Sequence, residues 1–318
     1  MDADIVIANV ASSDDSPSAP TRTFVPPFDD ADADLIVRSS DGFYFQVYKV
    51  ILAKASEVFK DMFAVPQPGQ QGTEGEDAEI PVVALAEDGK TLDRLLHLCY
   101  PISDPESYTL SDIGHLQVIC DKYGMEGITK NLERPLRGYL DSSPLRVYAI
   151  ACRGKYSKTA NEAAQRCLSK PMSYILEPDV PEFSDLSVTA YRALPSYHNR
   201  CAKVVSRLAA SNCEPWVTDL SFCWFRCNTC PPADTKMVTM RCQMIMVQPR
   251  RWWRQYMDQV SLALLEKPVP ESIADVHIPT KVDCRGPCGR AFAKDIARFN
   301  TLLEDQIRGT TRGVEFKI

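Results

Sequence analysis

The chain has 318 residues, which is enough for about two domains of ordinary size, each with its own hydrophobic core. Hydrophobic residues make up 45% and charged residues 25%, a balance typical of globular proteins. The formal net charge of -6 argues against general affinity for nucleic acid, which needs a surplus of Lys and Arg to neutralise phosphates.

The first 29 residues are rich in Asp, Ser, Pro and Ala, and we expect them to form a disordered acidic tail. They begin with acidic residues and lack a basic segment, so no secretory signal is predicted. No apolar run approaches the length of about 18 residues that spans a bilayer, so no membrane segment is expected either. We therefore expect an intracellular location, in the nucleus or the cytoplasm, where cysteines stay reduced.

Short strands and helices alternate between residues 30 and 140. Leu35–Val37 and Phe43–Tyr48 are β-rich runs on either side of an Asp-Gly turn, which predicts a β-hairpin. The apolar spacing then changes to that of a helix, and Ser56 is placed to cap a short helix that follows it. A third strand is predicted at residues 79–85, followed by helices over 92–99, 116–123 and 128–136. This order predicts an α+β domain with a three-stranded sheet covered by helices.

The segment from Asp34 to Phe63 resembles the signature of the BTB/POZ domain. In that signature an Asp opens the first strand, Gly and Phe flank the turn, and a His-Lys pair precedes a helical pattern. The matching residues here are Asp34, Gly42, Phe45, Lys49, Leu52, Ala53, Ser56, Phe59, Met62 and Phe63. LLHLCYP at residues 95–101 and DKYGM at 121–125 look like later helices of the domain. The resemblance covers residues 30–140.

Two details refine this resemblance. Tyr48 stands where the family usually has His, which we expect to alter local packing more than the fold. The sequence FAVPQP at residues 63–68 is similar to the BTB proteins of mushroom-forming fungi.

The resemblance implies a protein–protein interaction module that self-associates as a homodimer. It also implies an adaptor role, with a cullin-type ubiquitin ligase as a candidate partner, or a role as a transcriptional regulator. Asp34 and Lys49 match positions that form a charged pocket at the dimer surface in that family. An ordinary salt link at the edge of the hairpin is the alternative for this pair.

Residues 141–318 are predicted to be an all-helical C-terminal region, similar in arrangement to the helical extensions that follow BTB domains. A helix begins at Pro144, and the apolar pattern over 184–208 predicts two helices separated at Pro195. Pro215 is placed as the first residue of another helix, and amphipathic helices are predicted over 253–264 and 292–307.

Two cysteine pairs in this region have the spacing of metal ligands: Cys227 with Cys230, and Cys284 with Cys288. Zinc binds four thiolates tetrahedrally, and Cys-x₂₋₄-Cys turns supply two ligands each, so a structural zinc is a candidate cofactor. The pairs lie farther apart than in an ordinary zinc ribbon. The alternative is that they are reduced cysteines in loops or buried near Trp224.

No catalytic residues are predicted, because the sequence has no nucleophile motif, phosphate-binding glycine loop or His-Glu-x-x-His. The run Arg250–Arg254 mixes basic and aromatic side chains, which suits nucleic-acid stacking. We interpret it instead as the start of a helix with Trp253 in the core. The alternative overall function is a zinc-stabilised nucleic-acid or chromatin binder.

Overall fold

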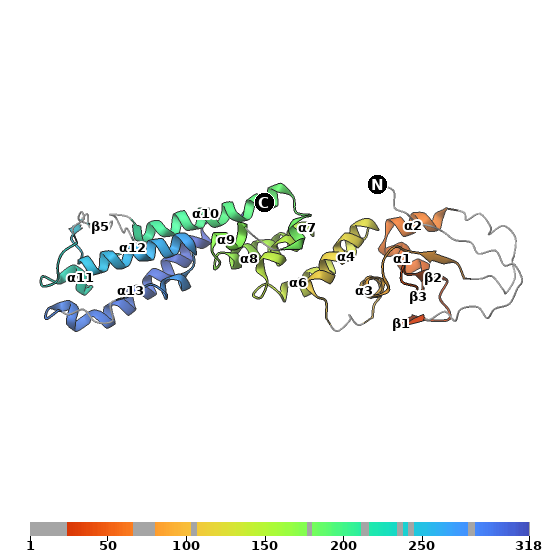
Figure 1. Cartoon of the computed structure of the whole chain (residues 1–318), viewed down its shortest axis with the longest axis horizontal. Helices are drawn as coiled ribbons and strands as arrows, with labels where there is room; N and C mark the ends of the chain where they lie inside the picture. Colours follow the sequence, from red (N-terminus) through yellow and green to blue (C-terminus); the bar gives the residue numbers. More distant parts are fainter. Residues whose placement is uncertain are drawn as a thin grey trace, which may run out of the picture. The chain divides into compact units, whose positions relative to one another are not determined.

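The computed structural model describes residues 24–65, 80–102, 107–176, 180–210, 216–233, 238–240, 245–278 and 284–317. The chain divides into two compact units, drawn in Figure 1. The first unit extends to Tyr139 and also includes Arg153–Tyr156, and the second comprises Leu140–Cys152 and Ser157–Ile318. No helix in the described ranges is long and apolar enough to cross a bilayer.

The first unit contains a four-stranded sheet in the order β1-β3-β2-β4. β2 and β3 form the predicted antiparallel hairpin, while β1 runs parallel to β3 and β4 runs parallel to β2. The strands are β1 (Phe24–Asp29), β2 (Leu35–Arg38), β3 (Tyr44–Val47) and β4 (Val82–Ala84). The hairpin and the later strand are confirmed, but the predicted sheet was one strand short.

The additional strand, β1, lies within the segment that we expected to be a disordered tail. Residues 1–23 of that segment lie outside the described residues, but residues 24–29 pair with β3. β1 contains two prolines, which an edge strand tolerates because one side of it has no sheet partner. Its Phe28 side chain is buried and packs edge-on against the rings of Phe45 and Tyr100. The prolines and neighbouring acidic residues concealed this anchor in the sequence.

Both faces of the central strand, β2, are buried. Leu35, Ile36 and Val37 are all buried, and successive side chains of a strand point to opposite faces, so neither face of β2 is open to solvent. The helices of this unit are α1 (Lys49–Ala55), α2 (Glu57–Ala64), α3 (Gly89–Cys99), α4 (Leu110–Lys122), α5 (Glu126–Thr129) and α6 (Glu133–Arg137), with a 3-10 turn, η1 (Lys130–Leu132). The predicted helix over 128–136 is therefore a succession of short segments.

Ser56 connects two of these helices through one hydroxyl group. Its oxygen accepts a hydrogen bond from the backbone N–H of Phe59 at 3.0 Å, which caps α2 as predicted. The same hydroxyl donates to the carbonyl of Tyr123, at the end of α4, at 2.5 Å. Ser56 is buried, so loss of the hydroxyl would leave both backbone groups without their partner.

The second unit is helical, as predicted, with one short β-hairpin in addition. It comprises α7 (Pro144–Arg153), α8 (Ser157–Cys167), α9 (Met172–Leu176), η2 (Pro181–Phe183), α10 (Val188–Ala210), α11 (Cys223–Arg226), α12 (Arg251–Glu266), η3 (Pro270–Ile273) and α13 (Pro287–Arg312). The hairpin pairs β5 (Val238–Met240) with β6 (Ile245–Val247). In Figure 1, α10 runs beside α12, and the two helices pack against each other.

Two helix predictions in this unit need correction. Pro195 does not separate two helices but lies inside the continuous α10. A proline inside a helix costs about 3 kcal/mol, and here the buried face of Leu194, Tyr197 and Cys201 continues across it and offsets that cost. Pro215 lies outside the described residues, and the helix predicted after it is reduced to the single turn α11.

We predict that replacing Ser56 with Ala lowers the unfolding free energy of the first unit by about 1–2 kcal/mol, because a helix cap and a buried carbonyl both lose their partner. Native-state hydrogen exchange of the α2 and α4 amides measures this within the unit. The exposed Ser40 provides the control, since its replacement with Ala should change stability by less than about 0.5 kcal/mol. Equal protection of these amides from exchange in the wild type and in Ser56→Ala would contradict the stabilising role of the Ser56 hydroxyl.

Candidate functional site

Asp34 and Lys49 lie together at the start of α1. The Asp34 carboxylate accepts a hydrogen bond from the backbone N–H of Lys49 at 2.7 Å. The contact therefore caps the first turn of α1, and it is made to the main chain of Lys49 and not to its ammonium group. Asp34 is exposed and Lys49 is half-buried, so their side chains remain at the surface.

Tyr48, the residue that departs from the family pattern, joins the same surface. Its hydroxyl donates to the carboxylate of Asp30, and its backbone N–H donates to the hydroxyl of Tyr100 at 2.8 Å. The hydrogen bond from Tyr48 holds the pKa of Asp30 below its ordinary value, and the same bond raises the pKa of Tyr48 to about 12. Asp30 and Tyr100 were not predicted as site residues, because their proximity to Tyr48 arises from the packing of β1 and α3.

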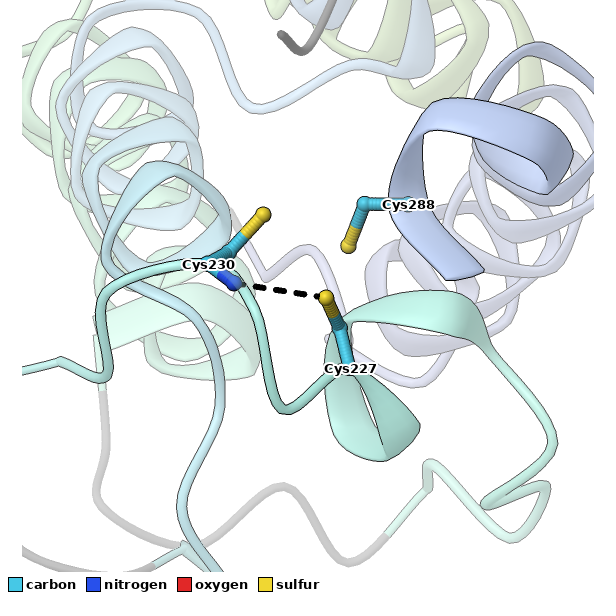
Figure 2. Close-up of side chains that lie close together, drawn as sticks. All are labelled: Cys227, Cys230 and Cys288. Carbon is cyan, nitrogen blue, oxygen red and sulfur yellow. Dashed lines mark hydrogen bonds between the residues drawn. The ribbon is translucent and has the colours of Figure 1, made fainter. Parts of the chain in front are cut away.

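The four predicted zinc ligands are brought to one place in the second unit. The sulfur atoms of Cys227, Cys230 and Cys288 all lie within 4.8 Å of one another, and Figure 2 shows their thiols pointing toward one another. The sulfur of Cys284 lies 3.5 Å from that of Cys227. Residues more than 50 positions apart therefore meet because the loop after α11 faces the start of α13.

Backbone groups surround these sulfurs. The N–H of Cys230 points at the Cys227 sulfur at 3.4 Å, and the N–H of Gly286 points at the Cys284 sulfur at 3.2 Å. Burial raises the pKa of the Cys227 thiol, but hydrogen bonds from backbone N–H groups, that of Cys230 first, outweigh this and bring the pKa to about 6. Burial raises the pKa of the Cys230 and Cys288 thiols.

A fifth cysteine, Cys223, lies on the buried side of α11. Its backbone N–H donates to the carboxylate of Asp295 at 2.8 Å, which fixes the start of α11 to the first half of α13. Burial raises the pKa of the Cys223 thiol to about 12. Cys223 was not predicted as a site residue, although its spacing of four residues from Cys227 was an available signal that it approaches the same cluster.

The loop after α11 is also held by the segment that precedes α12. Pro232 forms a β-bridge with Arg250, and the N–H of Arg251 donates to the carbonyl of Pro231 at 3.0 Å. The Arg250 guanidinium donates to the carbonyl of Cys230 at 3.0 Å. The backbone that follows Cys227 is therefore anchored to the start of α12.

The run Arg250–Arg254 faces the core more than the solvent. Trp253 is fully buried and stacks on Trp224 with the ring centroids 6.0 Å apart, as our interpretation of a core Trp253 predicted. Trp252 is half-buried and packs edge-on against Phe292. Nucleic-acid stacking needs exposed ring faces, and these two rings are used for packing.

We predict that Tyr48→Phe raises the pKa of Asp30 toward its ordinary value, because the carboxylate loses the hydrogen bond that favours its charged form. The hydrogen bond stabilises the fold above the unfolded-state pKa of Asp30, and this contribution is lost as the pH falls through the lower folded-state value. Carboxyl-carbon NMR across an acid titration measures the shift. Tyr139→Phe removes another hydroxyl hydrogen bond of this unit and should leave Asp30 unchanged.

Comparison with known proteins identifies the first unit. No curated protein matches the chain. The resemblance of residues 63–68 to fungal proteins stays a prediction, and residues 66–68 lie outside the described residues. The sequence model of the BTB/POZ domain matches residues 28–139, which include the end of β1, the strands β2 to β4 and the helices from α1 to α6. The chain therefore contains a BTB/POZ domain, a protein–protein interaction module, followed by a helical C-terminal region.

Proposed function

We propose that this protein is an adaptor that self-associates through its BTB domain and uses its other surfaces to bind protein partners. The observation that supports this most directly is the match of residues 28–139 to a domain that mediates protein–protein interaction. Adaptors need at least two binding surfaces, and the chain has two compact units that can provide them. This role places the protein inside the cell, in the nucleus or the cytoplasm.

The surface around the start of α1 is the best candidate for the self-association face. The charged residues Asp34 and Lys49 lie beside Val50, whose side chain is 57% exposed. In a protein–protein interface, an exposed apolar side chain supplies the surface that becomes buried. Charged groups around it fix how the two partners align. β1 adds a sheet edge in the same unit, where backbone groups can pair with a strand from another chain.

Among partners, we propose a cullin scaffold first, with a transcriptional regulatory complex as the second candidate. Both candidate partners are proposed because the chain contains a BTB domain, and the resemblance to that family implies such partners. Binding would proceed by burial of helix and strand surface, and a standard interface of this kind buries about 1,600 Å² in total.

We predict that the purified full chain elutes as a dimer. Light scattering coupled to gel filtration at micromolar concentration should give twice the chain mass of 35.6 kDa. A mass that stays at the monomer value across the concentration range would exclude stable self-association.

Three variants test the proposed face. Val50→Glu places a charge on the exposed apolar side chain and should shift the protein toward monomer. Asp34→Asn keeps an oxygen that can accept from the Lys49 N–H but removes the charge, so weaker association in this variant would assign the effect to charge and not to the helix cap. Val118→Glu changes an exposed valine of α4 and serves as the control, with unchanged association expected.

We also predict that the full chain binds the isolated N-terminal domain of a cullin. Calorimetric titration with the purified cullin domain should show saturable binding, and Val118→Glu and Val50→Glu variants map whether binding uses α4 or the α1 surface. No heat and no co-elution at high micromolar concentration would exclude the ligase role and leave the self-association proposal to be judged by its own experiment.

A further inference from the structure

We propose that Cys227, Cys230, Cys284 and Cys288 bind one structural zinc ion as a tetrathiolate site. The site would clip the loop after α11 to the start of α13. This inference concerns the second unit alone and does not depend on the function proposed for the BTB domain.

The distances between the sulfurs fit a shared metal better than a disulfide. At a Zn–S bond length of about 2.3 Å, the sulfurs of a tetrahedral site lie about 3.8 Å apart. The Cys227 and Cys284 sulfurs are 3.5 Å apart, and those of Cys227, Cys230 and Cys288 lie within 4.8 Å of one another. A disulfide requires about 2.05 Å between two sulfurs, and pairing two cysteines would leave the other two unexplained.

The backbone around both cysteine pairs is arranged for thiolates. In each pair, an N–H that lies two or three residues after the first cysteine points at its sulfur: Cys230 to Cys227, and Gly286 to Cys284. Such bonds orient a thiolate ligand and reduce the charge on its sulfur, and they commonly support the first shell of a metal site. The same pattern in two segments that are distant in the sequence is difficult to explain by core packing alone.

Two glycines allow the second pair to fold tightly. A Cβ on Gly289 would lie 1.7 Å from the carbonyl oxygen of Cys284, so only glycine permits the turn that brings Cys284 back over Cys288. A Cβ on Gly286 would lie 2.5 Å from the Thr229 hydroxyl oxygen and 3.4 Å from the Cys227 sulfur. Gly286 therefore allows the two cysteine segments to approach each other.

The fourth ligand is Cys284 and not Cys223. The Cys284 sulfur contacts that of Cys227 and, like the Cys227 sulfur, accepts a backbone N–H from its own segment. Cys223 lies within α11, and its backbone is already fixed to Asp295 on α13. Its thiol lies beside the cluster, in contact with the Cys288 thiol and the Asp295 carboxylate, so Cys223 is the alternative ligand that the variants below distinguish.

A site with four thiolates is closed, so its role is structural. Four protein ligands leave no position for a water molecule or a substrate. The ligand set would carry a net charge of about -2 with zinc bound, and Arg250, which donates to the Cys230 carbonyl, supplies a positive charge at this loop. The metal would stabilise the folded state, because the ligands converge only when α11 and α13 are packed.

The first test is metal analysis of the full chain, purified with a thiol reductant and without chelators. We expect about one zinc ion per chain, with release of the metal by a thiol-blocking mercurial. A content below about one fifth of an ion per chain after incubation with zinc and desalting would overturn the proposal. Because this measurement uses the unaltered protein, it does not depend on any variant folding.

Cysteine variants then identify the ligands. We expect zinc binding to be weakened at least about tenfold in each of Cys227→Ser, Cys284→Ser and Cys288→Ser. Removal of a group that only hydrogen-bonds to a metal ligand already costs roughly that much affinity. Cys223→Ser and the distant Cys152→Ser should retain the metal. Retention by Cys284→Ser together with loss in Cys223→Ser would overturn the proposed ligand set.

Cobalt substitution gives a readout that does not rely on stability. The chelator-treated full chain titrated with Co²⁺ should develop the intense visible bands of a tetrahedral cobalt–thiolate site, and zinc should abolish them. The nearby buried Trp224 should lose fluorescence as Co²⁺ binds, because the ion quenches a ring that lies three residues from Cys227. Pale bands typical of octahedral cobalt, with unchanged fluorescence, would contradict a four-thiolate site.

Discussion

The stacking of aromatic rings around Trp224 determines how the second unit is assembled. Trp224 lies parallel to Phe222 at 4.7 Å and to Trp253 at 6.0 Å, and Phe299 packs edge-on against it at 5.3 Å. All four side chains are fully buried. They come from the α11 segment, α12 and α13, so one cluster joins three parts of the chain that are distant in sequence. Offset and edge-to-face pairs of this kind add about 0.5–1.5 kcal/mol each beyond area burial.

The position of the cysteines is a consequence of that cluster. Cys227 follows Trp224 by three residues, and Cys288 lies in the first turn of the helix that supplies Phe299. Because the aromatic rings bring these segments together, the sulfurs meet without a requirement for their own attraction. A metal would add to a geometry that packing already favours, which distinguishes this region from small zinc modules that have no core without the ion.

The surface that we propose for self-association includes hydrogen bonds to the main chain. The Asp34 carboxylate accepts the backbone N–H of Lys49, and the backbone N–H of Tyr48 donates to the hydroxyl of Tyr100. Truncation of the Asp34 side chain would therefore remove both a surface charge and a hydrogen bond to the start of α1. The Ser56 contact performs a related role inside the domain, because one buried hydroxyl connects α2 with the end of α4.

The sequence by itself determined those features that depend on local spacing. The β2–β3 hairpin, the Ser56 cap and the amphipathic helices α12 and α13 could all be predicted, since each is encoded by turn residues, a capping residue or a helical apolar repeat within a few positions. The four cysteines could be recognised as a candidate set for the same reason, because each pair is close in sequence.

Only the tertiary structure decided the rest. β1 exists because Phe28 is buried against other elements, and α10 continues through Pro195 because burial along one face outweighs a local penalty. Whether the two cysteine pairs meet depends on more than 50 intervening residues, which no local pattern constrains. The packing of α11 against α13 brings them together, and the physical reason is long-range burial of aromatic surface, which sequence spacing does not record.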